Sequence, residues 1–294
     1  MRTPAWWQKH LLLLVLAGLC ACSAAEDTEK LLASAEKAKG EGNLQVAADL
    51  YHRTAGLRPD DFQTQYWTGL LYLQVNNLDE AEEHLGKALT LKPDSAPAHL
   101  NLGVVFLQRG RTEEGRKAFR EAIRLDPRFT RAYYNLGVVH LDEGRHDEAE
   151  VLLKTALTLD PTHQASYVRL GNLYVKERRY SAALDVLNQA VALNIEDPTA
   201  FFNLGLTYEG LGKPEHAMAA FKRAIALNPS TQGPIIIWAR CFSSKRITRR
   251  PLSHSKRRSD STLNRAMPPT TSQLLIRTWG SGQTPWRGYK RPLS

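Results

Sequence analysis

The sequence predicts an all-α fold in which six helix–turn–helix units stack into a solenoid. Three residue types recur with one spacing of 34 residues, which is enough for two short helices and their turns. The prolines are Pro59, Pro93, Pro127, Pro161 and Pro229, and Ile195 stands at the missing place in the series. The glycines and alanines are Gly69, Gly103, Gly137, Gly171 and Gly205, and Ala88, Ala122, Ala156, Ala190 and Ala224. The predicted units are therefore 28–61, 62–95, 96–129, 130–163, 164–197 and 198–231.

The fourth unit shows why each half of a unit is expected to be helical. Its first half places Tyr133, Leu136, Gly137 and His140 at i, i+3, i+4 and i+7, which is one helical face. His140 is therefore expected to be a buried core residue and not a metal ligand. Gly144 is expected to end this helix with a positive φ. The second half carries an apolar stripe of Ala149, Leu152, Ala156 and Leu159, and Asp160-Pro161 ends it because proline lacks the amide that a helix interior needs.

These residues resemble the tetratricopeptide repeat. The segments N-L-G-V-V-F-L-Q-R-G at 101–110, N-L-G-V-V-H-L-D-E-G at 135–144 and N-L-G-L-T-Y-E-G-L-G at 203–212 look like its first helix. The segment E-A-I-R-L-D-P at 121–127 looks like the end of its second helix. The first unit departs most, with Ser34-Ala35 and Thr54 at positions where Leu-Gly and Ala are usual. The resemblance implies a right-handed superhelix whose concave side is lined by the first helices.

The N-terminus reads as an export signal. Residues 1–21 place Arg2 and Lys9 before the apolar run from Leu11 to Leu19, which is too short to span a bilayer. Cys22 is the expected lipidation site, with Leu19 three residues before it and Ala21 just before it. Cys20 is the second choice, and an ordinary secretory signal is the alternative. Residues 22–27 would be a short linker, and the anchored chain is expected at the outer membrane, facing the periplasm.

Fifteen side chains on the first helices are expected to form a partner-binding groove. They occupy the fifth, sixth and ninth positions of units two to six, away from the face that pairs the two helices. These groove residues are Tyr66, Trp67, Leu70, Leu100, Asn101, Val104, Tyr134, Asn135, Val138, Val168, Arg169, Asn172, Phe202, Asn203 and Leu206. A large exposed apolar strip normally marks an interaction site, and the asparagines could bond the backbone of a bound segment. Packing between neighbouring first helices is the alternative, which is strongest for the twelfth positions such as Leu107.

The sequence offers no motif for catalysis, a metal or a cofactor. It lacks G-x-x-x-x-G-K-[ST], G-x-S-x-G, H-E-x-x-H and C-x-x-C, so neither an enzyme nor a small-molecule substrate is expected. The net charge of +9 is due to residues 232–294, which hold 13 Lys or Arg and one acid, Asp260. This stretch is either a disordered basic arm or the product of a frameshift. Residues 28–231 carry 24 basic and 27 acidic side chains, and nucleic-acid binding conflicts with the export signal.

The expected function is that of an adaptor that binds an apolar segment of a protein partner. The carboxylate clamp of some tetratricopeptide domains is not expected, because Leu32 and Glu36 stand where it uses lysine and asparagine. A lipid anchor with six such repeats is similar to the pilotin lipoproteins of type IV pili. That resemblance implies a secretin subunit as the partner and a role in outer-membrane secretin assembly, pilus biogenesis and motility. The alternative is a general periplasmic scaffold for cell-wall enzymes or proteases.

Overall fold

The computed structural model describes residues 28–193 and 196–229, in which every regular element is a helix. Residues 28–40 are helical and precede α2, Leu44–Leu57. The later first helices are α3 (Phe62–Gln74), α5 (Ala96–Gln108), α7 (Thr130–Asp142), α9 (Gln164–Lys176) and α11 (Pro198–Gly210). The later second helices are α4 (Leu78–Leu91), α6 (Thr112–Leu125), α8 (His146–Leu159), α10 (Tyr180–Ala192) and α12 (Pro214–Leu227). The expected signal peptide with Cys20 and Cys22, the linker, Ile195 and the tail 232–294 lie outside the described residues.

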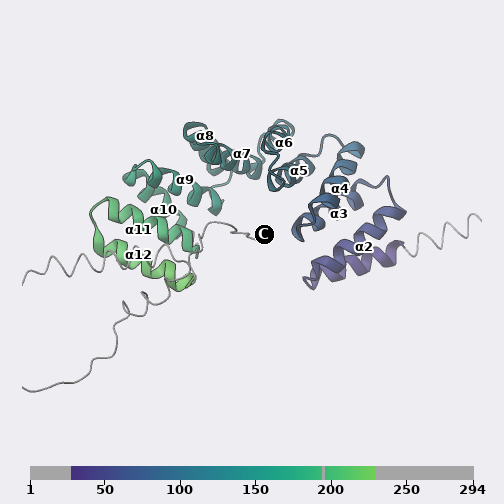
Figure 1. Ribbon diagram of the computed structural model, residues 1–294, viewed down its shortest axis with the longest axis horizontal. Helices are drawn as coiled ribbons and strands as arrows, with labels where there is room; N and C mark the ends of the chain where they lie inside the picture. Colours follow the sequence, from purple (N-terminus) through teal and green to yellow (C-terminus); the bar gives the residue numbers. More distant parts are fainter. Residues whose placement is uncertain (1–27, 194–195, 230–294) are drawn as a thin grey trace, which may run out of the picture. The chain divides into compact units, whose positions relative to one another are not determined.

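Each pair of helices packs as a hairpin, and each hairpin packs against the next one along the chain (Figure 1). The first helices also contact one another in the pairs α3–α5, α7–α9 and α9–α11. No pair of second helices in the described chain is equally close. The first helices therefore lie on the inner side of the stack, as the solenoid fold requires.

The glycine column lets the two helices of a hairpin approach each other closely. A Cβ atom added at Gly205 would lie 2.2 Å from Cε1 of Phe221, and one at Gly171 would lie 2.4 Å from Cδ2 of Leu187. Each of these large side chains therefore occupies the space above a glycine. The first unit uses Ala35 at this place, and this alanine is fully buried.

The turn inside each hairpin uses a left-handed residue. Gly144 has a φ of +74°, which confirms the expectation that it ends the first helix of unit four. Glycines occupy the same place in three further units, whereas Asn76 and Arg178 hold it in units two and five with φ of +62° and +59°. Asparagine tolerates this conformation better than most residues, but arginine adopts it rarely.

The hydrophobic core runs from hairpin to hairpin. Phe119 on α6 is fully buried in a cluster that includes Leu100 from its own unit and Leu136 and Val139 from the next unit. Leu153 on α8 packs in the same way against Leu170 and Leu173 on α9. Neighbouring units therefore share their cores, so that each unit completes the burial of the one before it.

Ion pairs add a second link between units, on the side of the second helices. Arg111 bonds to Glu82 of the preceding unit, with 2.6 Å between Nη1 and Oε1. Arg179 bonds to Glu150 of the preceding unit in the corresponding way, at 2.5 Å. Between units three and four the position of Glu82 is taken by Arg116, which bonds to Glu143 at 2.6 Å. At this junction the preceding unit supplies the cation and the following unit supplies the carboxylate, so an ion pair still links the two units.

Candidate protein-binding face

The groove residues lie on α3, α5, α7, α9 and α11, the helices on the inner side of the stack. Ten of the fifteen are half-buried: Tyr66, Trp67, Leu70, Val104, Tyr134, Asn135, Val138, Asn172, Phe202 and Leu206. Arg169 is exposed. The ten half-buried side chains include four aromatic rings and no charge, so the surface they offer is largely apolar.

Four of the groove residues are buried within the array. Leu100 is 1% exposed and belongs to the buried cluster around Phe119, and Val168 is 8% exposed. Asn101 and Asn203 are 4% and 1% exposed. Their side chains offer almost no surface to a partner, and the half-buried and exposed residues make up the accessible part of the face.

Asn101 bonds within the protein, between two units. Its Nδ2 donates a hydrogen bond to the hydroxyl oxygen of Tyr66 at 3.0 Å, which joins α5 to α3. Burial raises the pKa of the Tyr66 hydroxyl. Since the oxygen of Tyr66 accepts this bond, its own hydrogen stays free to donate, and no described residue accepts it.

Asn203 takes the place of Asn101 in the last unit but has no such bond. The residue corresponding to Tyr66 is Val168, which has no oxygen to accept a hydrogen bond. The Nδ2 atom of Asn203 is buried and no described group accepts from it. An unpaired buried donor of this kind lowers the stability of the folded chain.

Aromatic contacts fix the orientation of the half-buried rings. Tyr134 on α7 meets the His163 ring edge to face, with 5.1 Å between ring centroids. Phe202 on α11 lies 5.8 Å from the Phe221 ring. Trp67 on α3 carries the Lys39 ammonium 4.4 Å from its ring centroid. Each of these rings is therefore held by at least one contact within the array.

The first unit carries a polar cluster beside Trp67. Glu36 accepts hydrogen bonds from the Tyr51 hydroxyl and from Lys39, whose Nζ lies 2.6 Å from Oε2. The bond from Lys39 is the main reason that the pKa of the Glu36 carboxyl is lowered. This carboxylate is engaged by its own unit and stands where a carboxylate clamp would need an amide or a cation.

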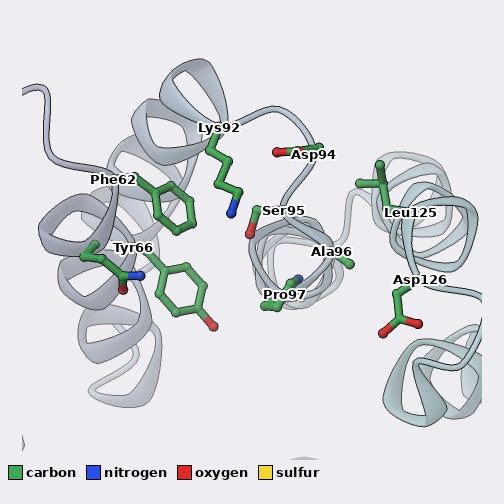
Figure 2. A pocket seen from close by; sticks show the side chains of 10 residues that line it. Phe62, Tyr66, Lys92, Asp94, Ser95, Ala96, Pro97, Leu125 and Asp126 are labelled. Carbon is green, nitrogen blue, oxygen red and sulfur yellow. The ribbon is translucent and has the colours of Figure 1, made fainter.

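A pocket of about 410 Å³ opens between the starts of α3 and α5 (Figure 2). The rings of Phe62 and Tyr66 stack 5.8 Å apart with an angle of 16° between their planes. Lys92 reaches toward them, with Nζ 5.5 Å from the centroid of the Phe62 ring. Leu125 and Asp126 lie on the other side, and Asp94, Ser95, Ala96 and Pro97, from the segment that leads into and begins α5, stand between.

Tyr66 is the only lining residue of this pocket that the sequence pattern identified. Phe62 begins α3, whereas Lys92 and Asp126 directly follow the ends of α4 and α6. That they line one pocket depends on how the hairpins stack, which a single unit does not reveal. One signal was available: Phe62 is the only aromatic residue at the first position of any unit, where the others have Thr28, Ala96, Thr130, Gln164 and Pro198.

The histidines serve packing. His140 is buried, as its position predicted, and burial lowers its pKa. His84 on α4 bonds to two neighbours: its Nε2 lies 2.9 Å from Nδ1 of His52 on α2, and its Nδ1 lies 2.7 Å from Oε1 of Gln65 on α3. Burial lowers the pKa of His84 to about 4. Within 28–193 and 196–229, no group of three or more histidines, cysteines or acids is placed to hold a metal ion.

Comparisons with known proteins agree with this geometry. Models of the tetratricopeptide repeat match residues 32–96, 69–128, 100–163, 140–204 and 198–231. The chain belongs to the tetratricopeptide-repeat family. Such an array is a protein-interaction scaffold, so protein partners are implied.

Solved structures with this fold include a type IV pilus biogenesis factor. PilF of Pseudomonas aeruginosa matches with a TM-score of 0.64 and 18% identity, over 74% of this chain and 99% of that one. PilW, described as a widely conserved type IV pilus biogenesis factor, matches with a TM-score of 0.63 and 18% identity, over 71% and 97%. Cut9–Hcn1 of the APC/C matches with a TM-score of 0.65 and 19% identity, over 73% and 42%. These identities show the fold alone.

No curated protein matches the sequence. Among the described residues, no helix is both long and apolar enough to cross a membrane.

Proposed function

We propose that this chain is a lipid-anchored adaptor that binds an apolar segment of a partner protein on the inner face of its repeats. The half-buried, largely uncharged face formed by the first helices is the observation that carries this proposal. A face of this kind suits an amphipathic helix or an extended apolar strand better than a charged peptide. The anchor would be a lipid on Cys22, or on Cys20 as second choice, and would hold the chain at the outer membrane, facing the periplasm.

The specific process proposed is the assembly of an outer-membrane secretin for type IV pili and pilus-dependent motility. It is supported by the likeness in fold to PilF and PilW and by the resemblance to pilotins, among which the myxobacterial social-motility lipoprotein Tgl is similar in architecture. In this scheme the inner face holds an apolar segment of the unassembled secretin subunit and releases it when subunits pair.

A pair of matched substitutions tests the binding face. Val138 on α7 is half-buried among the groove residues, whereas Val151 on α8 is 65% exposed on a second helix. In a strain that lacks the gene, Val138→Asp should fail to restore heat-resistant secretin multimers and surface pili, because a charge in an apolar face opposes binding. Val151→Asp should restore both. Circular dichroism must show equal helix content in the two variants.

Two outcomes would overturn parts of the proposal. Normal secretin multimers in the deletion strain would remove the secretin role. In that case, recovery of cell-wall enzymes or proteases by the purified chain, lost on Val138→Asp, would favour the periplasmic scaffold. Equal recovery of every partner by the Val138→Asp and Val151→Asp variants would reject the inner face as the binding site.

A further inference from the structure

We propose that the pocket between α3 and α5 is an anchor site for a large apolar side chain of the partner segment, preferably an aromatic one with a basic residue beside it. The proposal rests on the proposed function in that it extends the same inner face. It adds a subsite made largely of residues outside the groove set, and it specifies the partner's chemistry.

The walls of the pocket select an apolar group. The stacked rings of Phe62 and Tyr66 form one side, and Leu125 and Pro97 add apolar surface. Phe62 belongs to none of the buried clusters formed by the described residues, so core packing does not account for an aromatic ring at the first position of α3. A volume of about 410 Å³ lies at the lower end of the range of ligand pockets. It holds one large side chain and the backbone next to it.

The hydrogen-bonding groups suit a peptide backbone. The Tyr66 oxygen is already engaged by Asn101, so the hydroxyl hydrogen is the group left to bond a ligand. A peptide carbonyl oxygen is a matching acceptor. The bond to Asn101 holds the Tyr66 hydroxyl in place before the ligand arrives, which reduces the entropy lost on binding.

The charges of the lining favour a basic neighbour. Asp94 and Asp126 contribute two carboxylates, and Lys92 is the one cation among the lining residues. The Lys92 ammonium lies over the Phe62 ring, between that ring and the start of α5, and Asp126 lies beyond α5. An arginine or lysine beside the anchoring side chain would meet the two carboxylates, whereas an acidic neighbour would be repelled.

Short peptides test the site directly in the full-length chain. The probes are Ac-Arg-Phe-Arg-NH₂, Ac-Glu-Phe-Glu-NH₂ and Ac-Arg-Ala-Arg-NH₂, and binding is followed by saturation-transfer NMR. We expect the first probe to bind with a Kd on the order of 1 mM. Each of the other two should bind roughly tenfold more weakly, because one loses the charge match and the other the anchor.

Three variants locate the binding. Phe62→Ala should weaken the Arg-Phe-Arg probe roughly tenfold. The double variant Asp94→Asn, Asp126→Asn should bind the Arg-Phe-Arg and Glu-Phe-Glu probes about equally. Val151→Ala, which shortens an exposed side chain on α8 outside the groove residues, should bind as the unaltered chain does. Circular dichroism and thermal melting confirm that all three fold.

Equal binding of the arginine and glutamate probes by the unaltered chain, or unchanged binding by Phe62→Ala, would overturn the proposal. The adaptor function would survive this result, because its own test uses Val138 on α7. Conversely, pocket binding with normal secretin assembly by Val138→Asp would leave the anchor site standing and reject the proposed role of the wider face.

Discussion

At the scale of single residues, one residue type has opposite effects at two places in the array. Gly205 lies under the Phe221 ring, whereas a Cβ atom at Gly86 in the middle of α4 would meet nothing within 4 Å. Both glycines are helical, so both carry the entropic cost of glycine in a helix. Only Gly205 gains close helix packing in return.

We therefore predict opposite signs for two identical substitutions. Gly205→Ala should lower the free energy of unfolding by about 1–3 kcal/mol, because the added methyl group forces the Phe221 ring to move. Gly86→Ala should raise it by about 0.5–1 kcal/mol through helix propensity. Urea unfolding followed by circular dichroism measures both, and a stabilising Gly205→Ala would show that the hairpin packs more loosely than described.

Sequence reasoning works well for residues whose role is set by their position within the 34-residue unit. The left-handed φ of Gly144 and the burial of His140 follow from position within one unit. It works less well where the contacts of a side chain depend on a residue of the neighbouring unit. Asn101 and Asn203 hold the same position in their units, but Asn101 bonds to Tyr66, whereas the Nδ2 atom of Asn203 has no acceptor among the described residues because Val168 stands at the position of Tyr66. The difference comes from the preceding unit.

At the scale of elements, the junction between α8 and α10 depends on one carboxylate. Glu150 accepts bonds from Arg179 at 2.5 Å, Lys154 at 2.7 Å and the Tyr174 hydroxyl at 2.8 Å. The bond from Arg179 is the largest cause that lowers the pKa of Glu150, to about 2. Glu121 on α6 forms an ion pair with Arg124 on the same helix, and the side chains of Glu121 and Arg124 are 36% and 67% exposed.

We predict that Glu150→Gln costs about 1–3 kcal/mol of unfolding free energy at pH 7, whereas Glu121→Gln should change the unfolding free energy much less. The pKa of Glu150 is lower in the folded chain than in the unfolded chain. Its stabilisation is therefore complete above the ordinary pKa of 4.5 and is lost as the pH falls toward 2. The difference between wild type and Glu150→Gln should shrink over that range in urea titrations. A difference that stays constant down to pH 2 would contradict the ion-pair role.

His84 on α4, which bonds to His52 on α2, is a second group whose pKa changes when the chain folds. His84 lies against His52, Gln65 and the Tyr72 ring, with Glu83 and Lys87 beside it on α4. Because its pKa falls from 6.5 to about 4 on folding, the folded chain favours the neutral imidazole. The stabilisation is therefore complete above pH 6.5 and decreases as the pH falls toward 4.

Replacing His84 should make stability less dependent on pH. Leu152 holds the corresponding place in unit four, so His84→Leu keeps the packing and removes the titrating group. We expect wild type to lose more unfolding free energy than His84→Leu between pH 7 and pH 4.5. Urea midpoints at the two pH values give the comparison. Equal losses in the two proteins would assign the pH dependence to other groups, such as His140 and His163.

At the scale of the whole molecule, stability passes from unit to unit through shared core residues. Phe119 is fully buried between α5, α6 and α7. In a repeat array a lost contact weakens its own unit and the neighbouring unit first. Phe119→Ala should cost about 3–5 kcal/mol locally. Hydrogen exchange by mass spectrometry should then show faster exchange in α5 to α7 and little change in α11 and α12. Uniformly faster exchange would mean that the array unfolds as one unit.

The sequence predicts the architecture of this molecule better than its binding surface. The prolines, glycines and alanines that recur every 34 residues were enough to place six hairpins, because this common spacing determines which face of each helix is buried. The accessible face depends on how the hairpins stack, because stacking buries Leu100 and Val168 and makes Phe62 and Asp126 line the same pocket. Only the spacing between units, which no single residue encodes, decides those outcomes.

The close helix contacts at the five glycines also limit how the gene can change. A single-base change in a glycine codon that alters the amino acid always adds at least one carbon atom. Four of these five sites would place that atom 2.2–2.7 Å from the side chain opposite, and the fifth, Gly137, would place it at 3.2 Å. Gly137 is therefore the site at which random mutagenesis should most often recover a working allele.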